Sequence, residues 1–245
     1  MRAGDYNVGL RAGSATAETF LRRLLGAHLV DDDDAPANYS LHLDDAPTTR
    51  SGRALHLLFT GGSLTVRTAS PQRAVHALIA RLSDHVRGSD GAALRLKTGA
   101  VVGPAGAAIV PRRFARELVA HERRLADAGL RLVDTGVELD PDTGELVVPE
   151  PALTVEWSAL ELLPPGPDGA SVPAGRYPVV VWTTEQERTR GQLLAQAAGL
   201  ARDLDAVGPQ RALDALTGIL GTVPVAVLPA SVPVAIRDLG AAVAD

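Results

Sequence analysis

The stretch AAIVPRRFARELVAHERRLADAGLRLVDTGVELDPDTGELV, residues 107–147, decides the fold class of this chain. A short apolar strand ends at Pro111, an amphipathic helix follows over residues 112–128, and a second strand ends in Asp134. This order is typical of a nucleotide-binding unit, in which a glycine-rich loop joins the first strand to the helix. Every glycine of such a loop is missing here. The stretch therefore predicts an α/β frame that has lost its phosphate-binding chemistry.

The composition excludes several classes of protein. The 245 residues are enough for one large domain or two small ones, and the 46% hydrophobic and 22% charged fractions are typical of a globular protein. A net charge of −5 argues against a nucleic-acid-binding protein, and the absence of cysteine excludes a thiolate nucleophile and a zinc–thiolate site. No targeting segment and no apolar run of membrane-spanning length is present, so we expect a cytoplasmic protein that does not bind membranes.

The first part of the chain predicts a small α+β unit over residues 1–90, with a boundary at RGSDG (87–91). Gly61 and Gly62 predict a hairpin turn between two short strands. Ser70 is expected to cap a long helix whose first residue is Pro71. The expected helices lie at 15–28 and 71–86, the expected strands at 39–43, 54–59 and 63–67, and an acidic loop at 31–34.

The hairpin suggests a place where a peptide could bind. Its first strand carries Leu55, Leu57 and Phe59 in alternation, and an open strand edge offers main-chain hydrogen bonds to an extended peptide. The alternative is an edge that the first helix covers.

Residues 91–245 predict an α/β domain. Strands are expected at 93–102, 107–110, 130–134, 137–140, 145–148, 177–183 and 223–228, and helices at 112–128, 186–205, 209–220 and 231–243.

No catalytic residue, metal ligand or cofactor site follows from the motifs. GAALRLKT (91–98) departs from a phosphate-binding loop because Leu96 replaces its second glycine and because Lys97 lies within a strand. Lys97 is also the only lysine, so no other lysine-bearing phosphate loop can exist in this chain. His42 and His56 could face each other on paired strands, but a pair of sheet residues is the commoner reason for such a spacing than a metal site.

Arg112, Arg113 and Arg116 have two interpretations. They can belong to a solvated helix face with interspersed ion pairs. Alternatively, they can form an anion-binding or partner-binding site at the start of the helix. The anion would then be a carboxylate, either internal, such as Glu145 or Glu150, or from a partner.

From about residue 92 to the C-terminus, the order of elements resembles the kinase domain of HPr kinase/phosphorylase-like proteins. The resemblance lies in LRLKTGAVVGPAGAAIVP, GLRLVDTGVELDPDTGELVVPEP, GRYPVVVW and LGTVPVAVLPASVPVAIRDL. It places Leu118 where the family has its phosphate-binding lysine and Asp134 at a vestigial, magnesium-linked acidic position. It implies a degenerate phosphate-loop kinase-like domain after the N-terminal unit.

Several relatives of that group occur in gene clusters for ribosomally made, modified peptides. The degenerate pattern is similar to accessory recognition proteins of such clusters, for example those for daptides. That likeness implies a non-catalytic subunit that binds a precursor (leader) peptide or supports a modifying enzyme such as an oxidoreductase. Two alternatives stay open, a divergent phosphotransferase that uses Asp134 and a structural protein that forms homo-oligomers.

Overall fold

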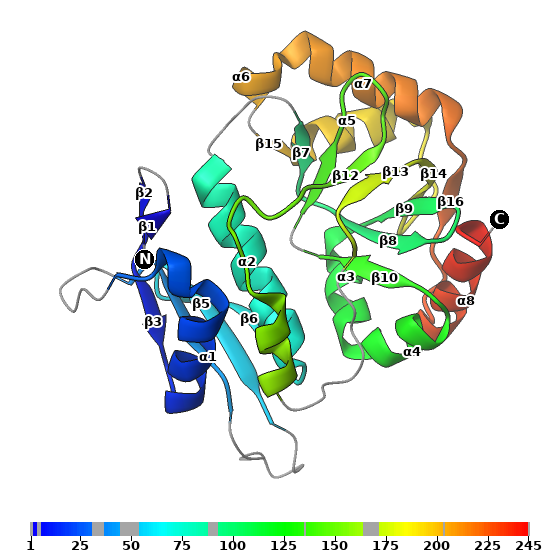
Figure 1. Ribbon diagram of the computed structural model, residues 1–245. Coiled ribbons are helices and arrows are strands. Elements are labelled where there is room, and N and C mark those ends of the chain that lie inside the picture. Colours follow the sequence, from blue (N-terminus) through cyan, green and yellow to red (C-terminus); the bar gives the residue numbers. More distant parts are fainter. Residues whose placement is uncertain are drawn as a thin grey trace. The chain divides into compact units, whose positions relative to one another are not determined.

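The computed structural model describes residues 2–3, 6–30, 37–44, 54–87, 93–134, 136–163, 172–202 and 204–244. The chain is a mixed α/β protein of two compact units (Figure 1). Unit 1 comprises Met1–Gly88 and Pro151–Gly169, and unit 2 comprises Ser89–Glu150 and Ala170–Asp245. The expected boundary at 87–91, apart from Arg87, and the acidic run at 31–34 lie outside the described residues.

Unit 1 is built on a four-stranded sheet in the order β3-β4-β5-β6, with β3 and β4 parallel and the other pairs antiparallel. Two helices and a 3-10 segment pack on one face of this sheet and form a single core with it. Its elements are β1 (Arg2–Ala3), β2 (Tyr6–Asn7), β3 (Leu10–Ala12), α1 (Ala15–Leu25), η1 (Gly26–His28), β4 (Tyr39–His42), β5 (His56–Thr60), β6 (Ser63–Thr68), α2 (Pro71–Arg87) and η3 (Trp157–Leu162).

The helices of unit 1 begin where the sequence predicts. The hydroxyl of Ser14 accepts a hydrogen bond from the N–H of Ala17 at 3.2 Å. The hydroxyl of Ser70 accepts one from the N–H of Arg73 at 3.3 Å. Gly61 and Gly62 both have positive φ, at 55° and 79°, which confirms the hairpin turn.

Residues 151–163 were expected in the second domain, but they belong to unit 1. Leu153, Ala159 and Leu163 are buried in the core of unit 1. The N–H of Glu156 donates to the carbonyl of Leu24 at 3.0 Å. We refer to residues 151–163 as the returning segment. The sequence of this segment does not reveal its destination, because its apolar residues suit either core.

Unit 2 contains two five-stranded sheets. The central sheet has the order β10-β8-β9-β14-β16, in which β9, β14 and β16 are parallel, and the second sheet, β13-β12-β11-β7-β15, is antiparallel throughout. The strands are β7 (Leu94–Leu96), β8 (Gly99–Gly103), β9 (Gly106–Val110), β10 (Arg131–Val133), β11 (Val137–Leu139), β12 (Leu146–Val148), β13 (Gly175–Tyr177), β14 (Val179–Thr184), β15 (Ala201–Arg202) and β16 (Val225–Val227).

The helices of unit 2 lie in two layers. One face of the central sheet packs against α3, α4 and α8. The other face shares a core with the second sheet, α5 and α7. The helical elements are α3 (Arg112–Leu118), η2 (Val119–His121), α4 (Glu122–Asp127), α5 (Arg190–Leu200), α6 (Leu204–Val207), α7 (Pro209–Thr222) and α8 (Val232–Ala242). No helix in the described part of the chain is both long enough and apolar enough to cross a bilayer.

Four expected elements are divided. The helix expected at 186–205 ends at Leu200, the short strand β15 follows, and α6 begins at Leu204. The strand expected at 93–102 becomes β7 and β8, which belong to different sheets. The strand expected at 177–183 is divided at Pro178, and its two parts likewise join different sheets. The helix expected at 112–128 is interrupted at His121, whose φ of −119° and ψ of 20° are not helical.

Candidate functional site

The corner between β9 and α3 is the place where a nucleotide-binding unit would carry its phosphate-binding loop. The chain passes from Val110 to the first helical residue, Arg112, through Pro111 alone, and no side chain caps the helix. A Cβ atom at Gly99 would collide with the side chain of Ala115, so α3 packs directly onto β8. This corner lacks the glycine-rich turn whose N–H groups would surround a phosphate.

The three arginines of α3 are exposed. Arg113 Nε lies 3.5 Å from Glu117 Oε1 one helical turn away, and the Arg113 side chain is 81% exposed. Glu145, the first internal carboxylate expected beside the arginines, instead accepts a hydrogen bond from Arg176. The expectation that Glu145 pairs with the arginines of α3 is therefore wrong. For Arg113, the ion pair with Glu117 agrees with a solvated helix face, while an anion site that binds Glu150 or a partner's carboxylate stays a prediction.

Asp134 follows β10, which runs antiparallel to β8 and therefore in the same direction as β9. Asp134 and Pro111 thus lie at the same edge of the central sheet, the edge formed by the carboxyl ends of its parallel strands. Such edges commonly hold the ligand sites of α/β proteins. Asp134 is half-buried.

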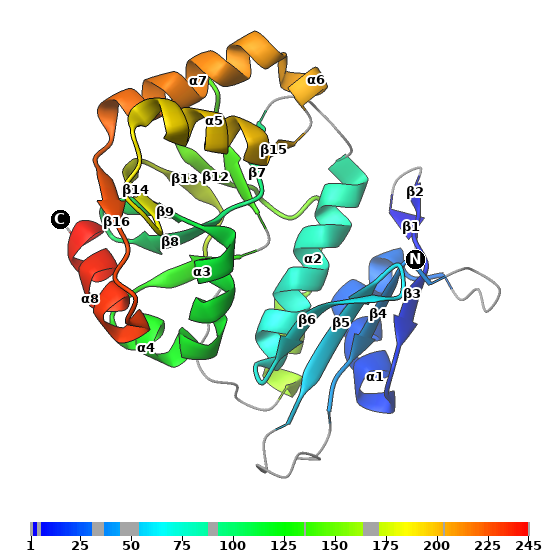
Figure 2. The ribbon, with the colours of Figure 1, turned by 180° about the vertical axis from the view of Figure 1, so that it is seen from behind.

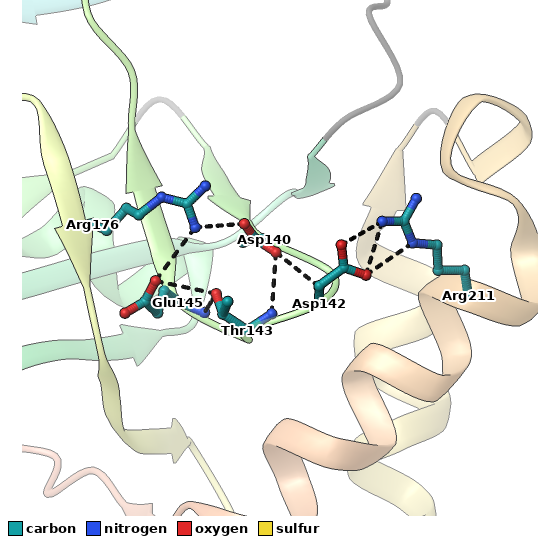
Figure 3. Close-up of polar contacts among 6 residues, drawn as sticks. All are labelled: Asp140, Asp142, Thr143, Glu145, Arg176 and Arg211. Atoms are coloured by element: carbon teal, nitrogen blue, oxygen red, sulfur yellow. Dashed lines mark hydrogen bonds and ion pairs between the residues drawn. The ribbon is translucent and has the colours of Figure 1, made fainter.

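The DPDTG hairpin between β11 and β12 forms a cluster of ion pairs (Figure 3). One carboxylate oxygen of Asp140 accepts from the N–H groups of Asp142 and Thr143, at 2.8 and 3.1 Å. The other accepts from Arg176 of β13, and this guanidinium holds the pKa of Asp140 below its usual value.

Asp142 forms a two-pronged ion pair with Arg211 of α7, at 2.7 and 2.8 Å (Figure 3). Because arginines already bind both of its aspartates, the hairpin is linked to β13 of the same sheet and to α7. No local pattern could have revealed these partners, since Arg176 and Arg211 lie 36 and 69 residues away from Asp140 and Asp142.

The expected edge residues require a correction. Leu57 and Phe59 belong to β5, which lies between β4 and β6, so the edge strand of the hairpin is β6. Leu55 precedes β5, and its N–H donates to Asp44 Oδ2 at 3.1 Å. The error arose because the sequence does not show that β4 pairs with the first strand of the hairpin.

Leu57 and Phe59 instead lie on the face of the unit 1 sheet that is opposite the core. The alternate residues His56 and Leu58 are buried on the core side. We define the open sheet face as Arg11, Ser40, His42, Leu57, Phe59, Leu64 and Arg67. Figure 2 shows it with its strands in front of α1.

The open sheet face has an apolar centre and basic margins. Phe59 lies between Ser40 and Leu64 in the register. Leu57 lies between His42 and Arg67, and Arg11 stands opposite Ser40. Leu64 is 50% exposed, and strands β3 to β6 contain no acidic residue.

The described residues include no group of three or more histidine or acidic side chains that could hold a metal ion. His42 and His56 point to opposite faces of the sheet, because His56 is buried while His42 stands opposite Leu57 on the open sheet face. A cavity of about 350 Å³ in unit 1 is lined by Ala15, Thr16, Thr19, Phe20, Leu162 and Leu163, none of which can donate or accept a proton near neutral pH.

No family model matches this chain, and neither a curated protein nor a solved structure shows significant similarity to it.

Proposed function

We propose that this chain is a non-catalytic subunit that binds an extended peptide on the open sheet face of unit 1. Its role would be to recognise a precursor peptide, or to support a modifying enzyme such as an oxidoreductase, in the biosynthesis of ribosomally made, modified peptides. The observation that carries the proposal is the open sheet face, with its apolar centre, its arginines and its lack of acidic residues.

This surface suits a peptide in two respects. The edge strand β6 borders the face and offers main-chain groups to an added strand. Leu57, Phe59 and Leu64 are available for the apolar side chains of such a peptide, while Arg11 and Arg67 attract acidic ones. The ligand class is therefore an extended peptide in which apolar and acidic residues alternate.

The corner between β9 and α3 supports the non-catalytic part of the proposal. A phosphotransferase must hold the β- and γ-phosphates of its nucleotide, commonly with a glycine-rich turn and a lysine. Here Pro111 alone joins strand and helix, and the only lysine, Lys97, lies between β7 and β8. In this proposal, unit 2 is a degenerate HPr kinase-like scaffold that retains the order of helices and strands but not the phosphate-binding loop.

The test is the binding of fluorescently labelled synthetic peptides in which leucine or valine alternates with aspartate or glutamate, measured by anisotropy at several salt concentrations. We expect saturable binding that weakens as salt rises, because part of the attraction is electrostatic. Arg67→Glu should weaken binding about fivefold or more. The matched control is Arg23→Glu on the exposed side of α1, which should bind as the unaltered chain does.

Equal effects of Arg67→Glu and Arg23→Glu would contradict a site on the open sheet face. The second test is a calorimetric titration of the same protein with Mg–ATP. We expect no heat of binding, and tight nucleotide binding would instead favour a divergent phosphotransferase that uses Asp134.

A further inference from the structure

Within the described residues, the three larger sheets end in six edge strands, one of which differs from the rest. An arginine on an edge strand repels a second copy of that strand, although it can attract an acidic peptide. Five of these edge strands each carry an arginine: β3 (Arg11), β6 (Arg67), β10 (Arg131), β13 (Arg176) and β15 (Arg202). The exception is β16, whose sequence is Val225-Ala226-Val227. It ends the central sheet of unit 2 without a charged side chain.

All three residues of β16 are exposed. Val225 is 37% exposed and Val227 is 48% exposed. The sequence around the strand carries no charge from Val223 to Ile236. An uncharged edge strand with exposed apolar side chains is a surface to which another strand readily adds.

The main chain of β16 is also oriented for pairing. The N–H of Trp182 donates to the carbonyl of Pro224 at 3.0 Å, and the N–H of Leu228 donates to the carbonyl of Thr184 at 2.8 Å. In a parallel ladder, alternate residues direct their polar groups to the same neighbour. The main chain of Ala226 therefore faces β14, while the N–H and C=O groups of Val225 and Val227 face away from it.

The outward-facing stretch is limited on both sides. The N–H of Val223 already donates to the carbonyl of Ile219 at 2.9 Å, which ends α7. Pro229 has no N–H to donate. Only Val225 and Val227 can therefore offer a complete pair of polar groups to an added strand.

We propose that β16 pairs antiparallel with β16 of a second copy of this chain, about a two-fold axis at Ala226. The sequence Val-Ala-Val reads the same in both directions, as an isologous contact requires. Val225 then faces Val227 of the second copy, in two equivalent pairs that exchange main-chain hydrogen bonds. Ala226 faces its own counterpart.

A second copy suits this edge better than a foreign peptide does. The strand has no charged group with which to select another sequence. Its symmetrical sequence, in contrast, places Val225 and Val227 of one copy opposite Val227 and Val225 of the other. Two three-residue strands bury less surface than a standard interface. The dimer therefore depends on protein concentration.

The lack of native cysteine permits a positional test. Ala226→Cys places two thiols at the axis, where facing Cα atoms of a non-hydrogen-bonded antiparallel pair lie about 4.5 Å apart, within the range that a disulfide spans. We expect a disulfide-linked dimer under mild oxidation. Val227→Cys is the matched control, because its thiol faces Val225 of the second copy, so it cross-links far less. The double variant Val225→Cys/Val227→Cys restores cross-linking.

Sedimentation velocity of the unaltered chain tests the same contact without cysteine. We expect the dimer fraction to rise with concentration and to be lost in Val227→Lys, which gives β16 a charge like those of the other edges. A chain that stays monomeric at every concentration overturns the proposal. So does equal cross-linking of Ala226→Cys and Val227→Cys, which would show random collision.

Discussion

The ring of His76 stacks on Trp157, with the ring centroids 4.8 Å apart and an angle of 23° between the planes. This contact joins α2 to the returning segment. Burial lowers the pKa of His76 from 6.5 to about 4, so the ring is neutral in the folded chain at neutral pH. Burial also lowers the pKa of His56, although nearby Asp44 partly opposes that shift.

These histidines predict acid sensitivity of unit 1. Because the folded pKa of His76 lies below the unfolded value, its contribution to stability is present above pH 6.5 and is lost as the pH falls towards 4. We expect a loss of about 1–3 kcal/mol in the free energy of unfolding over that window, measured by urea titration with tryptophan fluorescence.

The control for this prediction is His76→Phe, which keeps a ring against Trp157 and cannot titrate. Its stability should fall less between pH 6.5 and pH 4, and the remaining slope should come from other groups such as His56. An identical pH profile in the variant would show that His76 does not sense acid.

At the scale of residues, the sequence revealed what neighbouring positions decide. Ser70 was identifiable as a helix cap because its partner lies three residues ahead. Gly129 was identifiable as a helix end, and its φ of 71° confirms it. The arginine partners of Asp140 and Asp142 were not identifiable, because long-range folding brings them to the hairpin.

At the scale of secondary structure, local patterns were again informative and long-range pairings were not. Periodicity located most strands and helices, but it did not show that the strand expected at 93–102 serves two sheets. It also gave no order of strands within a sheet, so β5 was mistaken for an edge. The open sheet face depends on that order, since its rows combine residues from β3, β4, β5 and β6.

The DPDTG hairpin gives a prediction at this scale. Asp140→Ala removes two main-chain hydrogen bonds of the turn and the contact with Arg176, so we expect a loss of about 1 kcal/mol in the free energy of unfolding. Asp142→Ala removes only an exposed ion pair with Arg211 and should cause no measurable loss.

Urea unfolding of both hairpin variants at neutral pH measures this difference in the free energy of unfolding. The difference between them should shrink in acid, because the lowered pKa of Asp140 gives stability that is present above its usual pKa and lost as the carboxylate is protonated. Equal losses in the two variants would mean that the turn does not depend on Asp140.

For the whole molecule, the two tryptophans provide separate reporters. Trp157 belongs to unit 1 and Trp182 to the core of unit 2. Each unit has its own hydrophobic core, so we expect a cavity in one core to affect mainly the reporter of that unit. Leu82→Ala in unit 1 should lower the free energy of unfolding reported by Trp157 fluorescence by about 2–5 kcal/mol.

The measurement uses Trp182→Phe and Trp157→Phe backgrounds, each of which leaves one reporter. Leu216→Ala is the matched change in the core of unit 2 and should act mainly on the Trp182 signal. If either leucine variant shifts both signals equally, the two units unfold as one cooperative body.

The returning segment has a consequence for the synthesis of the chain on the ribosome. Leu153, Ala159 and Leu163 complete the core of unit 1, yet the first part of that unit ends at Gly88. At common elongation rates, residue 163 is added roughly 4–15 s after residue 88. During that interval α1 and α2 lack their covering, and the first strands of unit 2 have already emerged. Ending the gene at the apparent boundary near residue 90 would therefore give an incomplete N-terminal unit rather than a free-standing one.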